Sequence, residues 1–227
     1  MPNVILGVIG NGRKELLDRT IQSAKENLNY PFIKKIMIND TGDAQYAIQL
    51  EQEYGDEWHI ISHQQNQGLS GSVRSLWAAA LLLDADYVFH LEEDFTFNEP
   101  IYHEDFKDMM DLLNHPSYKI AQMALKRQPC NSEEAHAGGF MQLNYQCYTE
   151  FHEMGMAWVL HRLFFTLNPS LYPRWVIELG WEQGWGEKEF GERLFADPSI
   201  SCGYVGRINN PPLVTHIGNY RGNNWFV

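Results

Sequence analysis

The most constraining feature of the sequence is a short apolar segment that ends in three consecutive acids. Residues 87–91 (Tyr-Val-Phe-His-Leu) are followed directly by Glu92, Glu93 and Asp94. So short a run of aromatic and branched residues predicts a strand that is buried on both faces. Because an unpaired buried carboxylate is very costly, the acids must reach water or a cation where that strand ends. Taken alone, the segment is consistent with either a divalent-cation site or a solvated acidic turn.

Strands and helices alternate before this segment. The predicted strands lie at residues 3–9, 32–39 and 58–62, and the helices that follow them lie near residues 16–28, 44–54 and 72–83. This alternation predicts an α/β fold with a Rossmann-like, mostly parallel central sheet flanked by helices. Such sheets bind ligands at the C-terminal ends of their strands, which is where the three acids fall. No linker or repeat divides the chain, so we expect residues 1–227 to form a single domain.

Composition and charge exclude several classes of function. The net charge of −12, from 17 basic and 29 acidic residues, argues against broad, non-specific binding to nucleic acid. The longest apolar run, residues 76–83, is too short to span a membrane, and no signal peptide is evident. The three cysteines lack a CxxC pair and are typical of reduced thiols. We therefore expect a cytoplasmic protein, located in the host cytoplasm if it is viral.

Three loops after the predicted strands carry candidate ligand-binding residues. Residues 10–13 (Gly-Asn-Gly-Arg) precede a helix, where glycine permits close backbone approach and the helix N-terminus favours anions, although such a turn can simply reverse the chain. Asp40 follows the second strand. The polar loop 63–71 precedes a helix with Arg74 in its predicted first turn. A cation there suggests an anionic ligand nearby, although a local carboxylate would explain it as well.

The second half of the sequence is less regular. A helix is predicted at residues 105–113, strands at 118–125 and 153–160, and a further helix after Arg162. Residues 126–146 are polar, contain two adjacent glycines and predict a loop. Five of the seven tryptophans lie in this half. Their rings suit stacking on a sugar or a base, but tryptophan more often fills a core.

Taken in order, these features resemble glycosyltransferases of the GT-A fold over most of the chain. Asp40 resembles the acid that contacts the nucleotide base of the donor, and residues 66–68 (Asn-Gln-Gly) are similar to the Asn-x-Gly loop of that family. Residues 92–94 resemble the DxD motif, in the Glu-Asp-Asp form of N-acetylglucosaminyltransferase I-like enzymes. Residues 184–193 (Gly-Trp-Gly-Glu-Lys-Glu-Phe-Gly-Glu-Arg) are similar to the Trp-Gly-x-Glu-Asp region before the acceptor-site helix. The chain also resembles family 2-like enzymes and small soluble GT-A enzymes of phage type.

The resemblance implies a nucleotide-sugar-binding half, residues 1–98, and a mixed acceptor-binding half, residues 99–227. It implies Asp94 as a metal ligand, and His216 as a second ligand, although a lone histidine is more often structural. It implies that Trp181 and Trp185 contact the acceptor. The donor-binding residues that it implies are Gly10, Asn11, Arg13, Asp40, Asn66, Gly68, Arg74, Glu92 and Glu93.

The implied activity is metal-dependent transfer of a hexosyl or pentosyl group from a nucleotide sugar, in the first instance a UDP-sugar, to an acceptor hydroxyl. Mn²⁺ or Mg²⁺ would stabilise the charge on the leaving diphosphate. The acceptor hydroxyl needs a general base, for which Glu187 is the first choice and Glu189 the second, because Lys188 occupies one register of the family's catalytic acid. Attack from the face opposite the leaving group would invert the anomeric centre.

Two rival functions remain from the sequence. A nucleotidyltransferase also combines a related sheet, metal and acids, and residues 10–13 are similar to a truncated form of its glycine-rich signature. A non-catalytic sugar- or nucleotide-binding protein could keep the fold and lack the base, for which Lys188 gives a reason. The acceptor is equally open: a glycan, a protein side chain, a lipid-linked sugar or a hydroxylated DNA base, which would need only local contact if flipped out.

Overall fold

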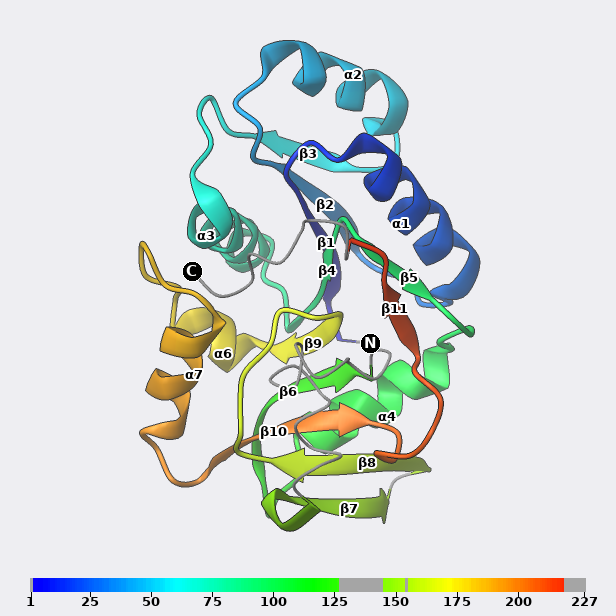
Figure 1. The fold of residues 1–227 in the computed structure, drawn as a ribbon, viewed down its shortest axis with the longest axis vertical. Coiled ribbons are helices and arrows are strands. Elements are labelled where there is room, and N and C mark those ends of the chain that lie inside the picture. The colour runs from blue at the N-terminus through cyan, green and yellow to red at the C-terminus, as the bar shows by residue number, and fades with distance from the viewer. Residues whose placement is uncertain (1, 127–144, 154, 219–227) are drawn as a thin grey trace.

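The computed structural model describes residues 2–126, 145–153 and 155–218, and its main element is a large central sheet (Figure 1). Residues 127–144 of the predicted 126–146 loop lie outside the described residues. Within the described ranges the sheet has nine strands. From one edge to the other they are β3 (His59–Ser62), β2 (Lys34–Asn39), β1 (Val4–Gly10), β4 (Tyr87–Glu92), β9 (Ser170–Pro173), β6 (Lys119–Leu125), β10 (Ile200–Val205), β8 (Met156–His161) and β7 (Tyr148–Glu153).

The sheet is mostly parallel, as the alternation of strands and helices predicts. Strands β1, β2, β3 and β4 are parallel to one another, and β6 and β10 are parallel to each other. Strand β9 lies antiparallel between β4 and β6, and β8 and β7 add an antiparallel hairpin at the edge. A separate two-stranded ladder pairs β5 (Phe95–Phe97) with β11 (Val214–His216). The chain is therefore a mixed α/β protein with an irregular second half.

Helices cover both faces of the sheet (Figure 1). They are α1 (Lys14–Asn27), α2 (Ala44–Tyr54), α3 (Gly68–Leu82), α4 (His103–Leu113), α6 (Arg174–Glu178) and α7 (Glu187–Phe195), with a 3₁₀ turn at Tyr145–Cys147. Alternate residues of β1 enter separate cores, Leu6 with α1 and α4, and Ile5 with α3, α6 and α7. A Cβ at Gly7 would lie 2.5 Å from Leu76, so glycine there lets α3 pack close to the sheet. Burial on both faces explains why β1 and β4 are almost wholly apolar.

Two predicted elements have different boundaries in the structure, and one predicted helix is wrong. The helix predicted at 72–83 begins at Gly68, so Arg74 lies beyond its first turn. The strand predicted at 153–160 begins later, as β8 from Met156 to His161, because the chain turns between β7 and β8 at Gly155, which has a φ of 80°. The helix predicted after Arg162 is absent from residues 163–169, which form an irregular segment leading into β9. There the backbone N–H groups of Thr166 and Leu167 donate to side chains of other elements, so helix bonds cannot form.

Candidate active site

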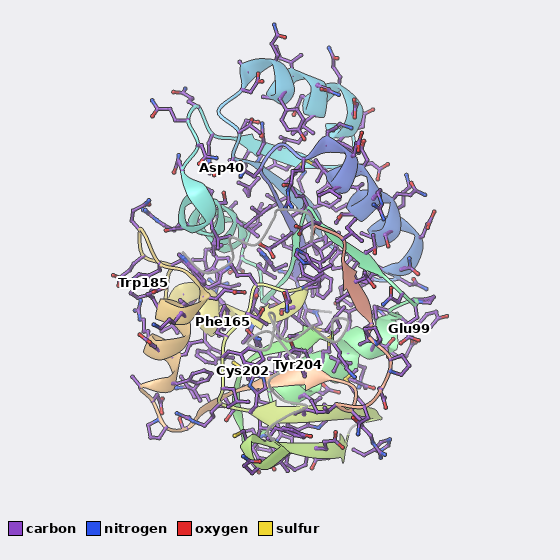
Figure 2. All side chains as sticks on the ribbon, viewed as in Figure 1. Asp40, Glu99, Phe165, Trp185, Cys202 and Tyr204 are labelled. Atoms are coloured by element: carbon purple, nitrogen blue, oxygen red, sulfur yellow. The ribbon has the colours of Figure 1, made fainter. Side chains whose placement is uncertain are left out.

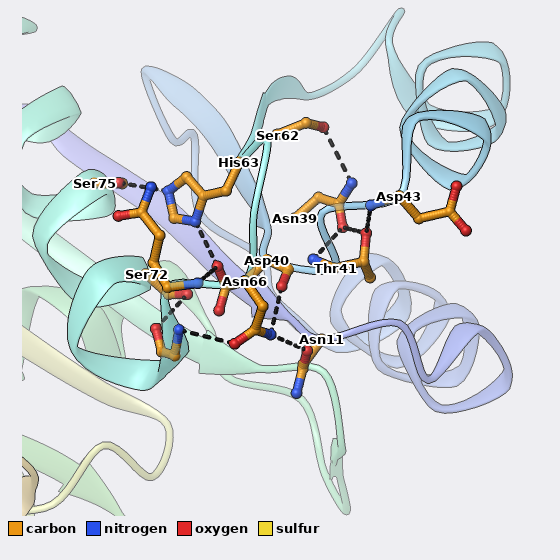
Figure 3. Close-up of polar contacts among 12 residues, drawn as sticks. Asn11, Asn39, Asp40, Thr41, Asp43, Ser62, His63, Asn66, Ser72 and Ser75 are labelled. Atoms are coloured by element: carbon orange, nitrogen blue, oxygen red, sulfur yellow. Dashed lines mark hydrogen bonds and ion pairs between the residues drawn. The ribbon is translucent and has the colours of Figure 1, made fainter.

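The loops after β1, β2 and β3 meet at one edge of the sheet, and Asn66 joins them (Figure 3). Its side-chain amide donates to the backbone oxygen of Asp40 at 2.7 Å and to Oδ1 of Asn11 at 3.0 Å. Its own Oδ1 accepts from the backbone N–H of Gly68 at 3.2 Å, and Gly68 has a φ of 71°, a conformation that glycine adopts without strain. One amide therefore holds three predicted donor-binding segments together.

Asp40 is buried at the centre of these loops, with 2% of its surface exposed. Its Oδ1 accepts from the backbone N–H of Gln67 at 2.8 Å and lies 2.6 Å from Nδ1 of His63. The Nε2 atom of His63 lies 2.7 Å from Oγ of Ser75. The sequence analysis did not identify His63 or Ser75 as site residues. The only signal in the sequence was that His63 is the first residue of the polar loop 63–71. The parallel strands bring Asp40 and this loop side by side, because Asn39 and Ser62 are in register.

Glu93 anchors the turn between β1 and α1. The side chain is 1% exposed, and its Oε2 accepts from the backbone N–H groups of Asn11 at 2.8 Å and Arg13 at 3.3 Å. Its Oε1 pairs with Nε of Arg13 at 2.6 Å. A Cβ at Gly10 would lie 3.0 Å from Oε2, which favours glycine at that position. Both carboxylate oxygens are thus used to position the turn, and Glu92, at the end of β4, is the more exposed acid.

Asp94 lies between Arg13 and His216. Its Oδ2 is 2.6 Å from Nη1 of Arg13 and 3.0 Å from Nε2 of His216, and its exposed fraction is 3%. Burial raises the pKa of Asp94, but hydrogen bonds and charge from His216 and Arg13 outweigh it, so the net pKa is lowered. His216 reaches this acid because β11 pairs with β5, where His216 is in register with Phe95. The backbone N–H of Ile217 also donates to the backbone oxygen of Asp94 at 2.8 Å.

The donor atoms at Asp94 and His216 suit a divalent cation only in part. A carboxylate oxygen and an imidazole nitrogen are ligands that Mn²⁺ accepts. Within the described ranges, however, no three side chains of the ligating types converge, and the Arg13 guanidinium already neutralises Asp94. The protein therefore fits an open site with two ligands. The remaining ligands would be water and the phosphates of a substrate, as is common for cations that bind nucleotides.

Glu187, the first residue of α7, points towards the protein interior. One of its oxygens, Oε1, accepts from Oγ1 of Thr166 at 3.0 Å and from the backbone N–H of Leu167. Lys188 points the other way, with 80% of its side chain exposed and its Nζ 4.0 Å from Glu192. The lysine therefore does not displace Glu187 from the inward face of the helix. Sequence reasoning missed Thr166, which lies in the wrongly predicted helix.

Glu189 has a different environment from Glu187. Its Oε2 accepts from the backbone N–H of Gly186 at 2.9 Å, closing the first turn of α7 in an exposed position. Hydrogen bonds from its own backbone N–H and that of Gly186 lower the pKa of the Glu189 carboxyl. A lowered pKa makes a weaker general base. Of the two predicted bases, Glu187 is half-buried and Glu189 is exposed.

The loop before α7 packs against the N-terminal part of α3. Oγ of Ser70 donates to the backbone oxygen of Glu182 at 2.8 Å and accepts from the backbone N–H of Gly184 at 3.0 Å. Nη1 of Arg74 donates to Oε1 of Gln183 at 2.9 Å. Arg74, predicted to bind the donor, thus contacts the loop that carries the predicted acceptor residues. This contact links α3 to the loop that precedes α7.

The two predicted acceptor tryptophans occupy different environments. Trp181 is 4% exposed and stacks on Phe190, with ring centroids 4.6 Å apart and planes 14° apart. Its indole N–H donates to the backbone oxygen of Trp185 at 3.0 Å, so Trp181 contributes mainly to the core. Trp185 is half-buried at the margin of the molecule (Figure 2), with the guanidinium of Arg193 5.3 Å from its ring centroid. Of the pair, only Trp185 presents a ring that a ligand could contact.

Solved structures of glycosyltransferases share this fold at low sequence identity. They include the mannosyltransferase PcManGT of Pyrobaculum calidifontis with GDP-Man and Mn²⁺ (TM-score 0.61, 12% identity over 97% of this chain) and TarS 1-349 of S. aureus with UDP-GlcNAc (TM-score 0.59, 11% over 94%). A third is GalNAc-T7 with UDP, GalNAc and Mn²⁺ (TM-score 0.61, 11% identity over 95%). The chain spans 58% of each of the first two proteins and 44% of the third. The expected GT-A fold is confirmed.

The sequence itself matches no protein-family model, and no curated protein sequence is detectably similar to it. In the part of the chain that the structure describes, no helix has both the length and the apolar character needed to cross a membrane.

Proposed function

We propose that this protein transfers a sugar from a nucleotide-sugar donor to an acceptor hydroxyl, with a divalent cation and with inversion at the anomeric carbon. One observation carries the proposal: on this fold, the loops at Asp40 and Asn66 meet at the same sheet edge as the Asp94–His216 pair. Donor binding is assigned to residues 1–98, with His216 contributed from the second half. A UDP-sugar is the first donor to test, and a GDP-sugar the second.

The residues after β1, β2 and β3 bind the donor in this proposal. Asp40 contacts the base, and the Asn66–Gly68 loop and the turn at Gly10 position the rest of the nucleotide. Mn²⁺ or Mg²⁺, held by Asp94 and His216, supplies Lewis acidity to the departing diphosphate when it is bound. Arg13 places a further positive charge beside Asp94. The contacts of Glu93 favour an indirect role, in which it holds Asn11 and Arg13 in place, while Glu92 contacts the ribose or the sugar.

Glu187 is the general base of the proposal. An acceptor hydroxyl has a pKa far above seven, so its proton must be taken by a group within hydrogen-bond reach. Thr166 and Leu167 orient the Glu187 carboxylate through Oε1. Burial raises the pKa of Tyr172 well above its ordinary value; a hydrogen bond with Ser170 opposes this rise, and the charges of Glu187 and Glu92 add to it. The hydroxyl of Tyr172 donates to the backbone oxygen of Thr166 at 2.7 Å, and Tyr172 is in register with Val88 of β4. These contacts support placing the acceptor base beside the β4–β9 pair.

The class of activity can be tested by thermal shift with a panel of nucleotide sugars, each with and without Mn²⁺. A donor at a hundred times its Kd stabilises the folded protein by about 2.7 kcal/mol. We expect the stabilisation by one UDP- or GDP-sugar to require Mn²⁺ and to vanish in Asp94→Asn, while Glu99→Gln, at an exposed site, behaves as wild type. Donor binding that is unchanged in Asp94→Asn would exclude this metal site.

The product released from the nucleotide then distinguishes a glycosyltransferase from a nucleotidyltransferase. A glycosyltransferase releases a nucleoside diphosphate, either with a supplied acceptor or by slow hydrolysis of the donor. A nucleotidyltransferase instead releases pyrophosphate. Donor binding without any turnover, across glycan, protein and hydroxymethylated DNA acceptors, would favour a non-catalytic binding protein.

A further inference from the structure

Asp40, His63 and Ser75 form a hydrogen-bonded chain that connects three separate segments (Figure 3). His63 lies between the carboxylate and the hydroxyl, 2.6 Å from Oδ1 of Asp40 and 2.7 Å from Oγ of Ser75. Asp40 and His63 are 2% and 9% exposed, and Ser75 is half-buried in α3. The donor and acceptor capacities of the groups determine the direction of the chain. A carboxylate only accepts, so Nδ1 of His63 carries a proton and donates to Asp40, while Nε2 faces the hydroxyl of Ser75, which can donate or accept.

The same residue types act as a nucleophilic triad in hydrolases, but the position of Ser75 does not suit that chemistry. Ser75 lies in the interior of α3, from Gly68 to Leu82, where backbone N–H groups are used in helix bonds. A hydrolase needs free N–H donors beside its nucleophile to stabilise an oxyanion. Because the hydrogen bond from His63 is donated to Asp40, we infer that His63 and Ser75 position the Asp40 carboxylate.

The two oxygens of Asp40 differ in their contacts. Oδ1 has two partners, the backbone N–H of Gln67 and the ring of His63. Within the ranges that the structure describes, Oδ2 has no hydrogen-bond partner. Oδ2 is also not among the fully enclosed polar atoms that lack a partner in the described ranges, so a ligand can reach it, and a ligand N–H there would form a strong, charge-assisted hydrogen bond. The pyrimidine and purine bases differ in whether they can supply that N–H.

We propose that His63, oriented by Ser75, is a positioning residue that holds Asp40 so that Oδ2 accepts an imino N–H from the base of the donor. Uracil and guanine present such an N–H on the ring, whereas cytosine and adenine present an acceptor nitrogen in its place. The site would therefore select UDP- or GDP-sugars over CDP- and ADP-sugars, and His63 would determine the size of this difference in affinity. This inference rests on the proposed function, because it concerns the base of the same donor.

The experiment measures the affinities of UDP, GDP, CDP and ADP by titration calorimetry with Mn²⁺, for wild type and four variants. A hydrogen bond to a buried charge corresponds to about tenfold to a hundredfold in affinity, so wild type should prefer UDP or GDP by that factor. His63→Ala should bind the preferred nucleotide about tenfold more weakly and leave CDP and ADP almost unchanged. Ser75→Ala should show a smaller loss, about threefold, because Asp40 still holds the ring.

Two further variants separate positioning from a general effect on folding. His63→Gln keeps a side-chain N–H that can donate to Asp40, and it should restore part of the base preference that His63→Ala loses. Gln64→Ala changes an exposed neighbour in the same loop and should bind all four nucleotides as wild type does. If His63→Ala does not fold, the preference in His63→Gln and Ser75→Ala decides, and a preference fully retained in both overturns the inference.

The outcomes distinguish the inference from the proposed function. A wild-type protein that binds none of the four nucleotides contradicts the proposed function itself. Nucleotide binding without a base preference leaves the proposed function standing and overturns the role of Asp40 and His63. An equal loss for all four nucleotides in His63→Ala shows that His63 is merely structural. A loss confined to UDP or GDP supports the positioning role.

Discussion

Two regions of the molecule are stabilised by different interactions: the β1–β4 edge, where the loops at the C-terminal ends of these strands meet, and the region around α7. At the β1–β4 edge, polar side chains bridge separate loops: Asn66 contacts Asp40 and Asn11, and Glu93 contacts the turn before α1. Around α7, Trp181 and Phe190 pack with other rings, and the polar bridge from Glu187 to residues 166–167 lies beside them. The first region therefore depends on individual hydrogen bonds, and the second on buried aromatic area.

The largest effect is expected in the second region, on catalysis. Glu187→Gln removes the proposed base, and general-base catalysis contributes about 10²–10⁴-fold, so kcat should fall by that factor. The glutamine oxygen can still accept from Thr166 and Leu167, so the fold and the donor affinity should be retained. Steady-state kinetics with calorimetric donor titration measure both quantities. Full activity of this variant would remove Glu187 from the mechanism, and Glu189→Gln would then be the variant to examine.

Trp181→Ala tests the aromatic packing. Removing a buried tryptophan costs about 3–5 kcal/mol of unfolding free energy, because lost transfer energy and a cavity add together. Urea denaturation measures the loss, and Trp185→Ala serves as the matched comparison because its ring is only half-buried. If the two variants lose equal stability, the distinction between a core tryptophan and an exposed one is wrong.

Glu93→Gln tests the polar bridges of the first region. The substitution replaces an acceptor of three hydrogen bonds by a group that can accept only in part, and we expect a loss of about 1–3 kcal/mol in the free energy of unfolding. Glu99→Gln is the exposed control. Donor affinity should fall as well, since the turn at Asn11 and Arg13 loses its anchor. Unchanged stability together with weakened donor binding would instead indicate direct contact with the donor.

The smallest effect concerns pH. The pKa of Asp94 is lowered from its ordinary value of 3.8, so its ion pairs stabilise the folded protein above that pH and are lost as the pH falls through the folded-state pKa. Thermal unfolding between pH 6 and pH 3 should therefore show a steeper decline for wild type than for Asp94→Asn at the acidic end. Parallel curves would mean that Asp94 contributes no such stabilisation.

Much of the first region could be predicted because its signals are local. The helix predicted at 44–54 is observed as α2, from Ala44 to Tyr54, and strands β1 to β4 lie where the apolar runs place them. The second region misled sequence reasoning where local and tertiary signals conflict. Residues 163–169 are apolar enough for a helix, but the N–H groups of Thr166 and Leu167 are bonded to Gln122 and Glu187 instead. Those partners are distant in the sequence, so no local pattern announces them.

Helix α7 shows which part of the site the sequence could predict: the spacing of its inward-facing residues, but not the residue at which the helix begins. Phe190, Gly191 and Leu194 are buried, and Glu187 lies on the same face by helical spacing, whereas Lys188 and Glu192 face solvent. The periodicity was present in the sequence. Choosing between the registers of Glu187, Lys188 and Glu189 required knowing where the helix begins, and helix ends are the least certain feature of any prediction.

By itself, the sequence determined the alternating α/β order, the strand that ends in three acids and the loops at Asp40 and Asn66. Periodicity and turn residues act over short distances along the chain, and this is why they could be interpreted without a structure. Only the tertiary structure decided the partners of those groups. His216 reaches Asp94 across 122 positions, and His63 takes its place between Asp40 and Ser75, because sheet register and packing bring together residues whose separation along the chain carries no signal of contact.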